Sequence, residues 1–92
     1  MYFVYILQSE KDSLLYTGFT GNLEARLQRH EKGEVPSTRF RRPLKLIFYE
    51  AYTVKSDALR REQYFKTTKG KTTLKIMLKN YFEKQNPKIV NI

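Results

Sequence analysis

The hydrophobic and polar positions of the first third of the chain follow a period of two. Residues 2–7 are apolar on both faces of that pattern, which predicts a central strand buried on both sides. Polar residues 8–13 interrupt the pattern, and residues 14–19 resume it. The two apolar segments therefore predict a hairpin whose loop is longer than two residues.

A helical period follows the predicted hairpin. Residues 22–32 place Leu23 and Leu27 one turn apart, and Gly33 stands where a helix-ending glycine is expected. Residues 34–43 then predict a basic loop.

The second half begins with a third strand, predicted over residues 44–53. Ser56 is the predicted N-cap of a helix that runs to about Thr67, with Asp57 favourable in its first turn. Gly70 is predicted to break this helix.

A last helix is predicted from Thr72 to about Phe82, with Leu74 and Leu78 on its apolar stripe, and a short tail begins at Pro87. The order β-β-α-β-α-α, with three strands, predicts an α+β fold: a small, mostly antiparallel sheet flanked by helices. At 92 residues, one domain over 1–92 is expected.

Composition narrows the class of protein. Hydrophobic residues make up 40% of the chain, so a folded core is expected, and the absence of cysteine excludes disulfides and thiolate metal sites. The N-terminal MYFVYIL lacks a basic flank and is too short to predict a signal peptide or a membrane span. A cytoplasmic location is the resulting expectation.

Charge suggests the kind of partner. Eighteen Lys and Arg against nine Asp and Glu give a net charge of +9, which favours a polyanion such as nucleic acid. Residues 37–43 contain three arginines, and residues 66–88 contain seven lysines and one acid. The alternative is a lysine-rich surface that serves only solubility.

Glu62 is the carboxylate with the most informative position. Its helical neighbours include Ala58, Leu59 and Phe65, so it lies at the edge of an apolar stripe. It could pair with Lys66 one turn later, or it could bind Mg²⁺, which often takes one protein carboxylate and fills its octahedron with water and substrate oxygens.

Arg26, Arg29 and His30 lie along one side of the first predicted helix. They follow a turn that contains glycine, and unpaired N–H groups at a helix N-terminus favour anions, so a phosphate site is one interpretation. A solvated charged face is the other. Tyr5 and Tyr16 could pack in the core or line a cleft, because the sequence does not define the hairpin register.

These residues, in this order, resemble the GIY-YIG nuclease family. Phe3-Val4-Tyr5 and Tyr16-Thr17-Gly18 stand at its two strand motifs, Arg26 and His30 match its first helix, and Glu62 matches its metal-binding glutamate. The likeness covers about residues 2–70 and leaves a basic C-terminal helix and tail. It is greatest to small stand-alone members, akin to the N-terminal nuclease module of the bacterial excision-repair incision subunit and to homing endonucleases.

The resemblance implies metal-dependent hydrolysis of DNA phosphodiester bonds. By the family's pattern, Tyr5 would help to activate the attacking water, and Tyr16 would position the water or the phosphate. Arg26 would stabilise charge on the phosphate, and His30 would assist in proton transfer or orientation. Glu62 would hold a single Mg²⁺ or Mn²⁺.

Some features depart from the family or leave an alternative open. Phe3, Val4 and Thr17 replace motif residues, and Asn80 or Asn86 only loosely matches an asparagine that many members carry after the glutamate helix. A non-catalytic nucleic-acid-binding module is the alternative function, and a partner protein could supply specificity. The residues expected to contact nucleic acid are Gly18, Arg29, Arg39, Arg41, Arg42, Lys66, Lys69 and Lys71.

Overall fold

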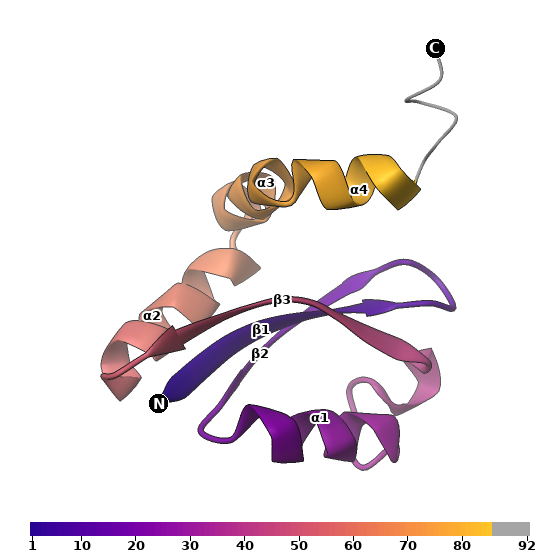
Figure 1. The fold of residues 1–92 in the computed structure, drawn as a ribbon, viewed down its shortest axis with the longest axis horizontal. Coiled ribbons are helices and arrows are strands. Elements are labelled where there is room, and N and C mark those ends of the chain that lie inside the picture. Colours follow the sequence, from indigo (N-terminus) through magenta and orange to yellow (C-terminus); the bar gives the residue numbers. More distant parts are fainter. Residues whose placement is uncertain (86–92) are drawn as a thin grey trace. The chain divides into compact units, whose positions relative to one another are not determined.

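A three-stranded sheet organises the first part of the molecule. The computed structural model describes residues 1–85, and the chain divides into two compact units, residues 1–62 and residues from 63 onward. Both strand pairs of the sheet are antiparallel, in the order β2-β1-β3 (Figure 1). The strands are β1 (Tyr2–Ser9), β2 (Leu15–Thr20) and β3 (Leu44–Tyr52). The predicted α+β fold with an antiparallel sheet is confirmed.

The central position of β1 explains its unbroken apolar run. Val4, Tyr5 and Ile6 have no exposed surface, and Leu7 is 1% exposed, so both faces of the strand are buried. Apolar side chains alternate between the two faces, and each side therefore contributes to the core. The pairing with β3 shifts at Ile6 and Leu7, because Ile47 is an extra residue between their partners.

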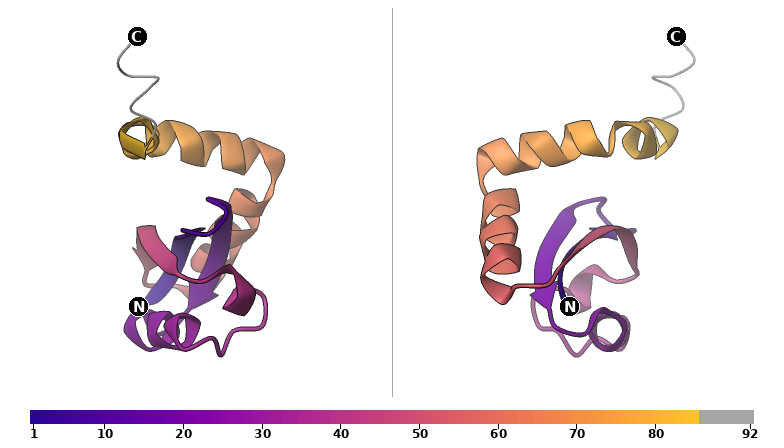
Figure 2. Two further views of the ribbon diagram at one scale, coloured as in Figure 1. Left: turned by 90° about the vertical axis from the view of Figure 1, so that its right-hand side faces the viewer. Right: turned by 60° about the vertical axis from the view of Figure 1, so that its left-hand side comes forward.

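One helix, α1 (Leu23–Glu31), lies along one face of the sheet (Figures 1 and 2). It begins where the Asn22 side chain accepts a hydrogen bond from the backbone N–H of Ala25, at 3.1 Å. It ends before Gly33, whose φ of +77° is the left-handed conformation predicted for a helix-ending glycine.

The basic loop that follows contains a turn of 3-10 helix, η1 (Arg39–Arg41). Two residues of this loop are buried, Val35 at 3% and Thr38 at 0% exposure. The hydroxyl of Ser9 donates to the carbonyl of Arg41 at 2.6 Å, which joins the loop to the end of β1. The loop is therefore an ordered part of the first unit.

Helix α2 (Lys55–Lys66) starts one residue before the predicted N-cap. The prediction of Ser56 as N-cap was wrong, because the carbonyl of Val54 already accepts from the N–H groups of Asp57 and Ala58. Asp57 does lie in the first turn, as predicted, and its carboxylate accepts from Arg60 at 2.7 Å.

The second unit corrects two predictions about helix ends. Gly70 does not break a helix but lies inside α3 (Thr68–Met77), where a side chain would collide with the carbonyl of Tyr64. The break comes at Thr67, which has extended backbone and whose hydroxyl accepts from the N–H of Gly70 at 3.0 Å.

The single last helix predicted for residues 72–82 is instead two helices. Helix α3 ends at its C-cap, Leu78, and α4 (Lys79–Gln85) follows. The predicted tail from Pro87 lies outside the described residues. Among residues 1–85, every helix is too short or too polar to cross a membrane.

Candidate active site

The hairpin register places the two motif tyrosines on one face of the sheet. Tyr5 pairs with Gly18, and Tyr16 pairs with Leu7, so the tyrosines are diagonal neighbours on adjacent strands. Their ring centroids are 6.2 Å apart. The register, which the sequence left open, therefore brings both phenols to the face that α1 covers.

The Tyr5 ring leaves no room for a side chain at position 18, which is occupied by a glycine. A Cβ at Gly18 would overlap the Tyr5 ring, and the glycine itself is buried. The prediction that its backbone approaches nucleic acid remains untested. Its evident role is to leave space for a buried phenol. The sequence alone did not show this role, because it did not define which residue pairs with Tyr5 across the strands.

Helix α1 adds Arg26 and His30, which are one turn apart, to this face. The Tyr5 hydroxyl oxygen is 2.8 Å from His30 Nε2, and Arg26 Nε donates to the same oxygen at 3.3 Å. The His30 ring also packs edge-on against Tyr16, with centroids 5.2 Å apart. Three elements thus bring together a cluster of four predicted catalytic residues: Tyr5, Tyr16, Arg26 and His30.

Burial and charge define the protonation of this cluster. Burial, with the charges of Arg26 and Arg29, lowers the pKa of His30 from 6.5 to about 4, so the imidazole is neutral at pH 7. Burial is also the main cause that raises the pKa of Tyr5 to about 12, although the Arg26 hydrogen bond opposes it. The hydrogen bond to Tyr5 raises the pKa of Arg26. At neutral pH the cluster therefore combines a phenol, a neutral imidazole and a guanidinium.

Only one edge of the cluster reaches solvent. Tyr5 is 0% and His30 is 1% exposed, whereas Arg26 and Tyr16 are partly exposed. A phosphate from solution would therefore meet Arg26 and Tyr16 first, and Tyr5 and His30 support them from within.

Glu62, the predicted metal ligand, lies on α2 and is partly exposed, while Ala58 one turn earlier is fully buried. This position at the border of an apolar face is the one predicted. Within residues 1–85, no group of three or more His, Asp or Glu side chains could hold a metal ion. The carboxylate of Glu62 is an oxygen donor of the kind that Mg²⁺ and Mn²⁺ prefer, and these ions can complete their shell with water and substrate oxygens.

The family model for the GIY-YIG catalytic domain matches residues 1–75. The chain belongs to the GIY-YIG family. Similar proteins include UPF0213 protein SH2523 of Staphylococcus haemolyticus, 42% identical over 77 residues that cover 83% of this chain and 93% of that protein. UPF0213 protein SERP0126 of Staphylococcus epidermidis is 40% identical, and UPF0213 protein SAV0488 of Staphylococcus aureus is 38% identical, with the same coverage. No solved structure shows a significant match.

The arginines of the basic loop of this GIY-YIG domain are not equivalent. Arg42 donates to the carbonyl of Arg39 at 2.9 Å and to that of Glu31, at the end of α1, at 3.1 Å. Arg41 donates to the carbonyl of Leu15 and lies 3.8 Å from the Asp12 carboxylate. Both guanidinium groups therefore brace the fold, which the count of arginines could not show.

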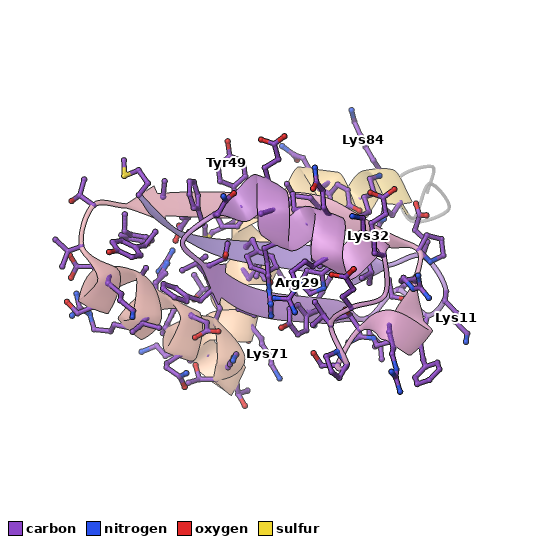
Figure 3. All side chains as sticks on the ribbon, turned by 90° about the horizontal axis from the view of Figure 1, so that it is seen from below. Lys11, Arg29, Lys32, Tyr49, Lys71 and Lys84 are labelled. Carbon is purple, nitrogen blue, oxygen red and sulfur yellow. The ribbon has the colours of Figure 1, made fainter. Side chains whose placement is uncertain are left out.

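The remaining predicted nucleic-acid contacts on α1, in the basic loop and in the second unit are exposed, as Arg42 also is. Arg29 on α1 is about half exposed and pairs with Glu34 at 3.7 Å; the helix and its Arg29 side chain are seen over the sheet in Figure 3. Arg39 is exposed and lies over the Phe40 ring, 4.7 Å from its centroid. In the second unit, Lys66, Lys69 and Lys71 are exposed, as is Asn80, and Asn86 lies outside the described residues.

A cavity of about 800 Å³ lies between α1, the basic loop and β3. Apolar side chains such as Leu27 and Leu46 form part of its lining, with Arg39 and Arg42 among the polar residues. Of the four clustered residues, His30 alone lines it. The candidate site in the GIY-YIG domain is therefore the exposed edge at Arg26 and Tyr16, not this cavity.

Proposed function

We propose that this chain is a metal-dependent endonuclease that hydrolyses DNA phosphodiester bonds. The observation that supports it most is the cluster of Tyr5, Tyr16, Arg26 and His30, because a member of the GIY-YIG family here retains a set of groups suited to phosphate chemistry. The net charge of +9 agrees with a DNA substrate.

In this proposal the exposed edge of the cluster binds substrate. Arg26 donates to the oxygens of the scissile phosphate and offsets the charge that develops there. Tyr16, with its partly exposed side chain, positions the attacking water. The water oxygen bonds to phosphorus and loses a proton to solvent, while the bond from phosphorus to the leaving oxygen breaks and that oxygen takes a proton from solvent.

Tyr5 and His30 act from beneath that edge. Because Tyr5 is buried and its pKa is raised to about 12, it acts as a neutral phenol that holds Arg26 and His30. We therefore assign the water-facing role to Tyr16, and Tyr5 contributes through its two hydrogen bonds. His30 Nε2 lies 2.8 Å from the Tyr5 hydroxyl oxygen, so His30 contributes by orienting Tyr5 rather than by taking its proton.

Glu62 would hold the Mg²⁺ or Mn²⁺ ion through its carboxylate. The ion would supply charge neutralisation at the phosphate and at the leaving oxygen. A single protein carboxylate leaves most of the coordination shell to water and phosphate oxygens, so the metal is expected to bind tightly only with DNA present.

A cleavage assay on supercoiled plasmid and on labelled branched and single-stranded DNA tests the proposal, with Mg²⁺, with Mn²⁺ and with chelator. Wild type should cut only with metal, and Glu62→Ala and Glu62→Gln should not cut, since neither side chain offers a charged oxygen to the metal. Glu24→Ala removes an exposed glutamate of α1 and should cut as wild type does. Undiminished cleavage by Glu62→Gln would contradict the assigned metal ligand.

The same experiment separates the alternative function. Absence of cleavage over the whole panel, together with DNA binding that weakens steeply with salt, would identify a non-catalytic nucleic-acid-binding module. In that case a partner protein would be the next component to seek. Cleavage by the chain alone would exclude that alternative.

A further inference from the structure

The hydrogen-bonded cluster continues beyond His30 to a residue that the sequence did not single out. His30 Nδ1 is 2.8 Å from the hydroxyl oxygen of Thr38, and that hydroxyl is 3.5 Å from the carbonyl of Val35. Thr38 is 0% exposed. A buried chain of polar groups thus runs from Arg26 through Tyr5 and His30 to Thr38 in the basic loop.

The donors in this chain favour one tautomer of His30 over the other. A guanidinium can only donate, so the Tyr5 oxygen accepts from Arg26. In the arrangement in which no donor faces a donor, the hydroxyl hydrogen of Tyr5 points to His30 Nε2, whose lone pair accepts the hydrogen bond. If Nε2 accepts from Tyr5 and His30 is neutral, its single N–H is on Nδ1 and donates to Thr38, whose own hydrogen can turn to the carbonyl of Val35.

The opposite tautomer fits these neighbours less well. A hydrogen on Nε2 would bring two donors, His30 and Arg26, to the Tyr5 oxygen. The Thr38 hydroxyl would then have to donate to Nδ1 and would turn away from Val35. The cost falls on the buried Tyr5 hydroxyl, whose hydrogen would lose Nε2 as its acceptor where water does not replace it.

We propose that Thr38 is a positioning residue that holds His30 as the Nδ1–H tautomer, so that Nε2 receives the Tyr5 hydroxyl and the Tyr5 oxygen holds Arg26. Thr38 touches neither substrate nor metal. It acts on the guanidinium of Arg26 through two intermediate side chains. Its effect on the rate rests on the proposed nuclease function, whereas its effect on the tautomer does not.

The placement of Thr38 supports this role over simple packing. Its side chain is on a loop, four residues before the arginine that is bound to the end of α1. Position 38 is therefore held on a braced loop against the helix that carries His30, which fixes the hydroxyl where Nδ1 needs an acceptor. A residue that only filled space here would not require a hydroxyl.

Nitrogen NMR of the full chain tests the tautomer directly. His30 is the one histidine of the sequence, so its two ring nitrogens can be assigned without ambiguity. At pH 7, wild type should show protonated Nδ1 and unprotonated Nε2, and Thr38→Ser should retain that pattern. Thr38→Val keeps the shape and removes the hydroxyl, so it should shift the signals toward the other tautomer.

Cleavage rates give the second readout. Thr38→Val should lower kcat about tenfold or more with little change in KM, because misorientation acts on the reacting geometry, and Thr38→Ser should restore the rate to within about threefold. Melting temperatures of the two variants show whether either has lost its fold.

The outcomes separate this proposal from the proposed function. Protonated Nε2 in wild type, or an unchanged tautomer in folded Thr38→Val, would overturn the role of Thr38 even if the chain cuts DNA. A wild-type tautomer as predicted and shifted in Thr38→Val would support the role even if the chain cuts no DNA, in which case the nuclease proposal alone would fail. If Thr38→Val does not fold, protonated Nε2 in the wild-type spectrum would still overturn the role.

Discussion

The arginines of α1 and those of the basic loop both lie in basic stretches of the sequence, but their side chains bind different partners in the structure. Arg26 on α1 is partly exposed and donates to the hydroxyl of a buried tyrosine. Arg41 and Arg42 in the loop donate to backbone carbonyls of Leu15, Glu31 and Arg39. A guanidinium bound to fixed carbonyls braces a fold, whereas one held at the edge of a polar cluster keeps N–H groups available for a phosphate. Local charge density does not distinguish the two.

The largest expected effect is that of Arg26. Arg26→Ala should lower the cleavage rate at least about 100-fold, because one donor to the developing charge of the transition state is lost. Rates on supercoiled plasmid, with melting temperatures to verify folding, measure this. Arg29→Ala, on the same helix and about half exposed, is the matched control and should change the rate only a few-fold. Equal losses in the two variants would mean that Arg26 has no special position.

A smaller effect is expected in the loop, and on stability. Arg41→Met should lower the free energy of unfolding by about 1–2 kcal/mol, because it loses the hydrogen bond to Leu15 and the ion pair with Asp12. Arg39→Met should change it by less than about 0.5 kcal/mol, since Arg39 is exposed. Urea unfolding of both variants measures the difference. If Arg39→Met were the more destabilising of the two, the assignment of Arg41 as an arginine that braces the fold would be wrong.

The last expected effect is a pH dependence of stability that comes from the buried side of the α1 cluster. The pKa of folded His30 is about 4, below its ordinary 6.5, so between these values the unfolded chain binds more protons. The contribution of neutral His30 to the free energy of unfolding is complete above pH 6.5. It is lost as the pH falls toward 4, by at most about 1.4 kcal/mol per pH unit. Thermal unfolding between pH 6.5 and 5 measures it. His30→Gln should reduce that slope, and an unchanged slope would contradict the assignment.

Two carboxyl groups with lowered pKa values contribute little to the change in stability between pH 6.5 and 5. The pKa of Glu50 is lowered because, although burial opposes ionisation, hydrogen bonds from Arg61 and Tyr52 outweigh it. The pKa of Asp12 is lowered chiefly by the hydrogen bond from the backbone of Leu14. Both carboxylates therefore affect stability only at lower pH, and the slope above pH 5 belongs mainly to His30.

Periodicity predicted the sheet and α1 well, because one side of each strand or helix must be buried. The run of residues 2–7 implied a central strand, and Gly33 implied the end of α1, and both are confirmed. Helix ends in the second half were harder. Glycine has a low helix propensity, so Gly70 was expected to end a helix. It lies inside α3 instead, at a position where the backbone of Tyr64 leaves no room for a side chain. Tertiary packing decided that position, not propensity.

Some features of the candidate site were predicted from the sequence, and others were found only in the structure. Family motifs indicated Tyr5, Arg26 and His30, which the structure brings together. Thr38 had no such signal, since one threonine eight residues after a histidine is unremarkable until both are known to be buried. The register of the hairpin was likewise open, because only packing against α1 selects which face each tyrosine occupies.

The central claim is that the Tyr5 hydroxyl joins Arg26 and His30 into one catalytic cluster, and the variant Tyr5→Phe tests it most directly. It removes one oxygen and retains the ring that packs beside Gly18. Tyr49→Phe, at an exposed position of β3 seen in Figure 3, is the control. We predict that folded Tyr5→Phe nicks supercoiled plasmid at least about 100-fold more slowly with Mg²⁺, while Tyr49→Phe matches wild type. Nicking by folded Tyr5→Phe at the wild-type rate would contradict the account.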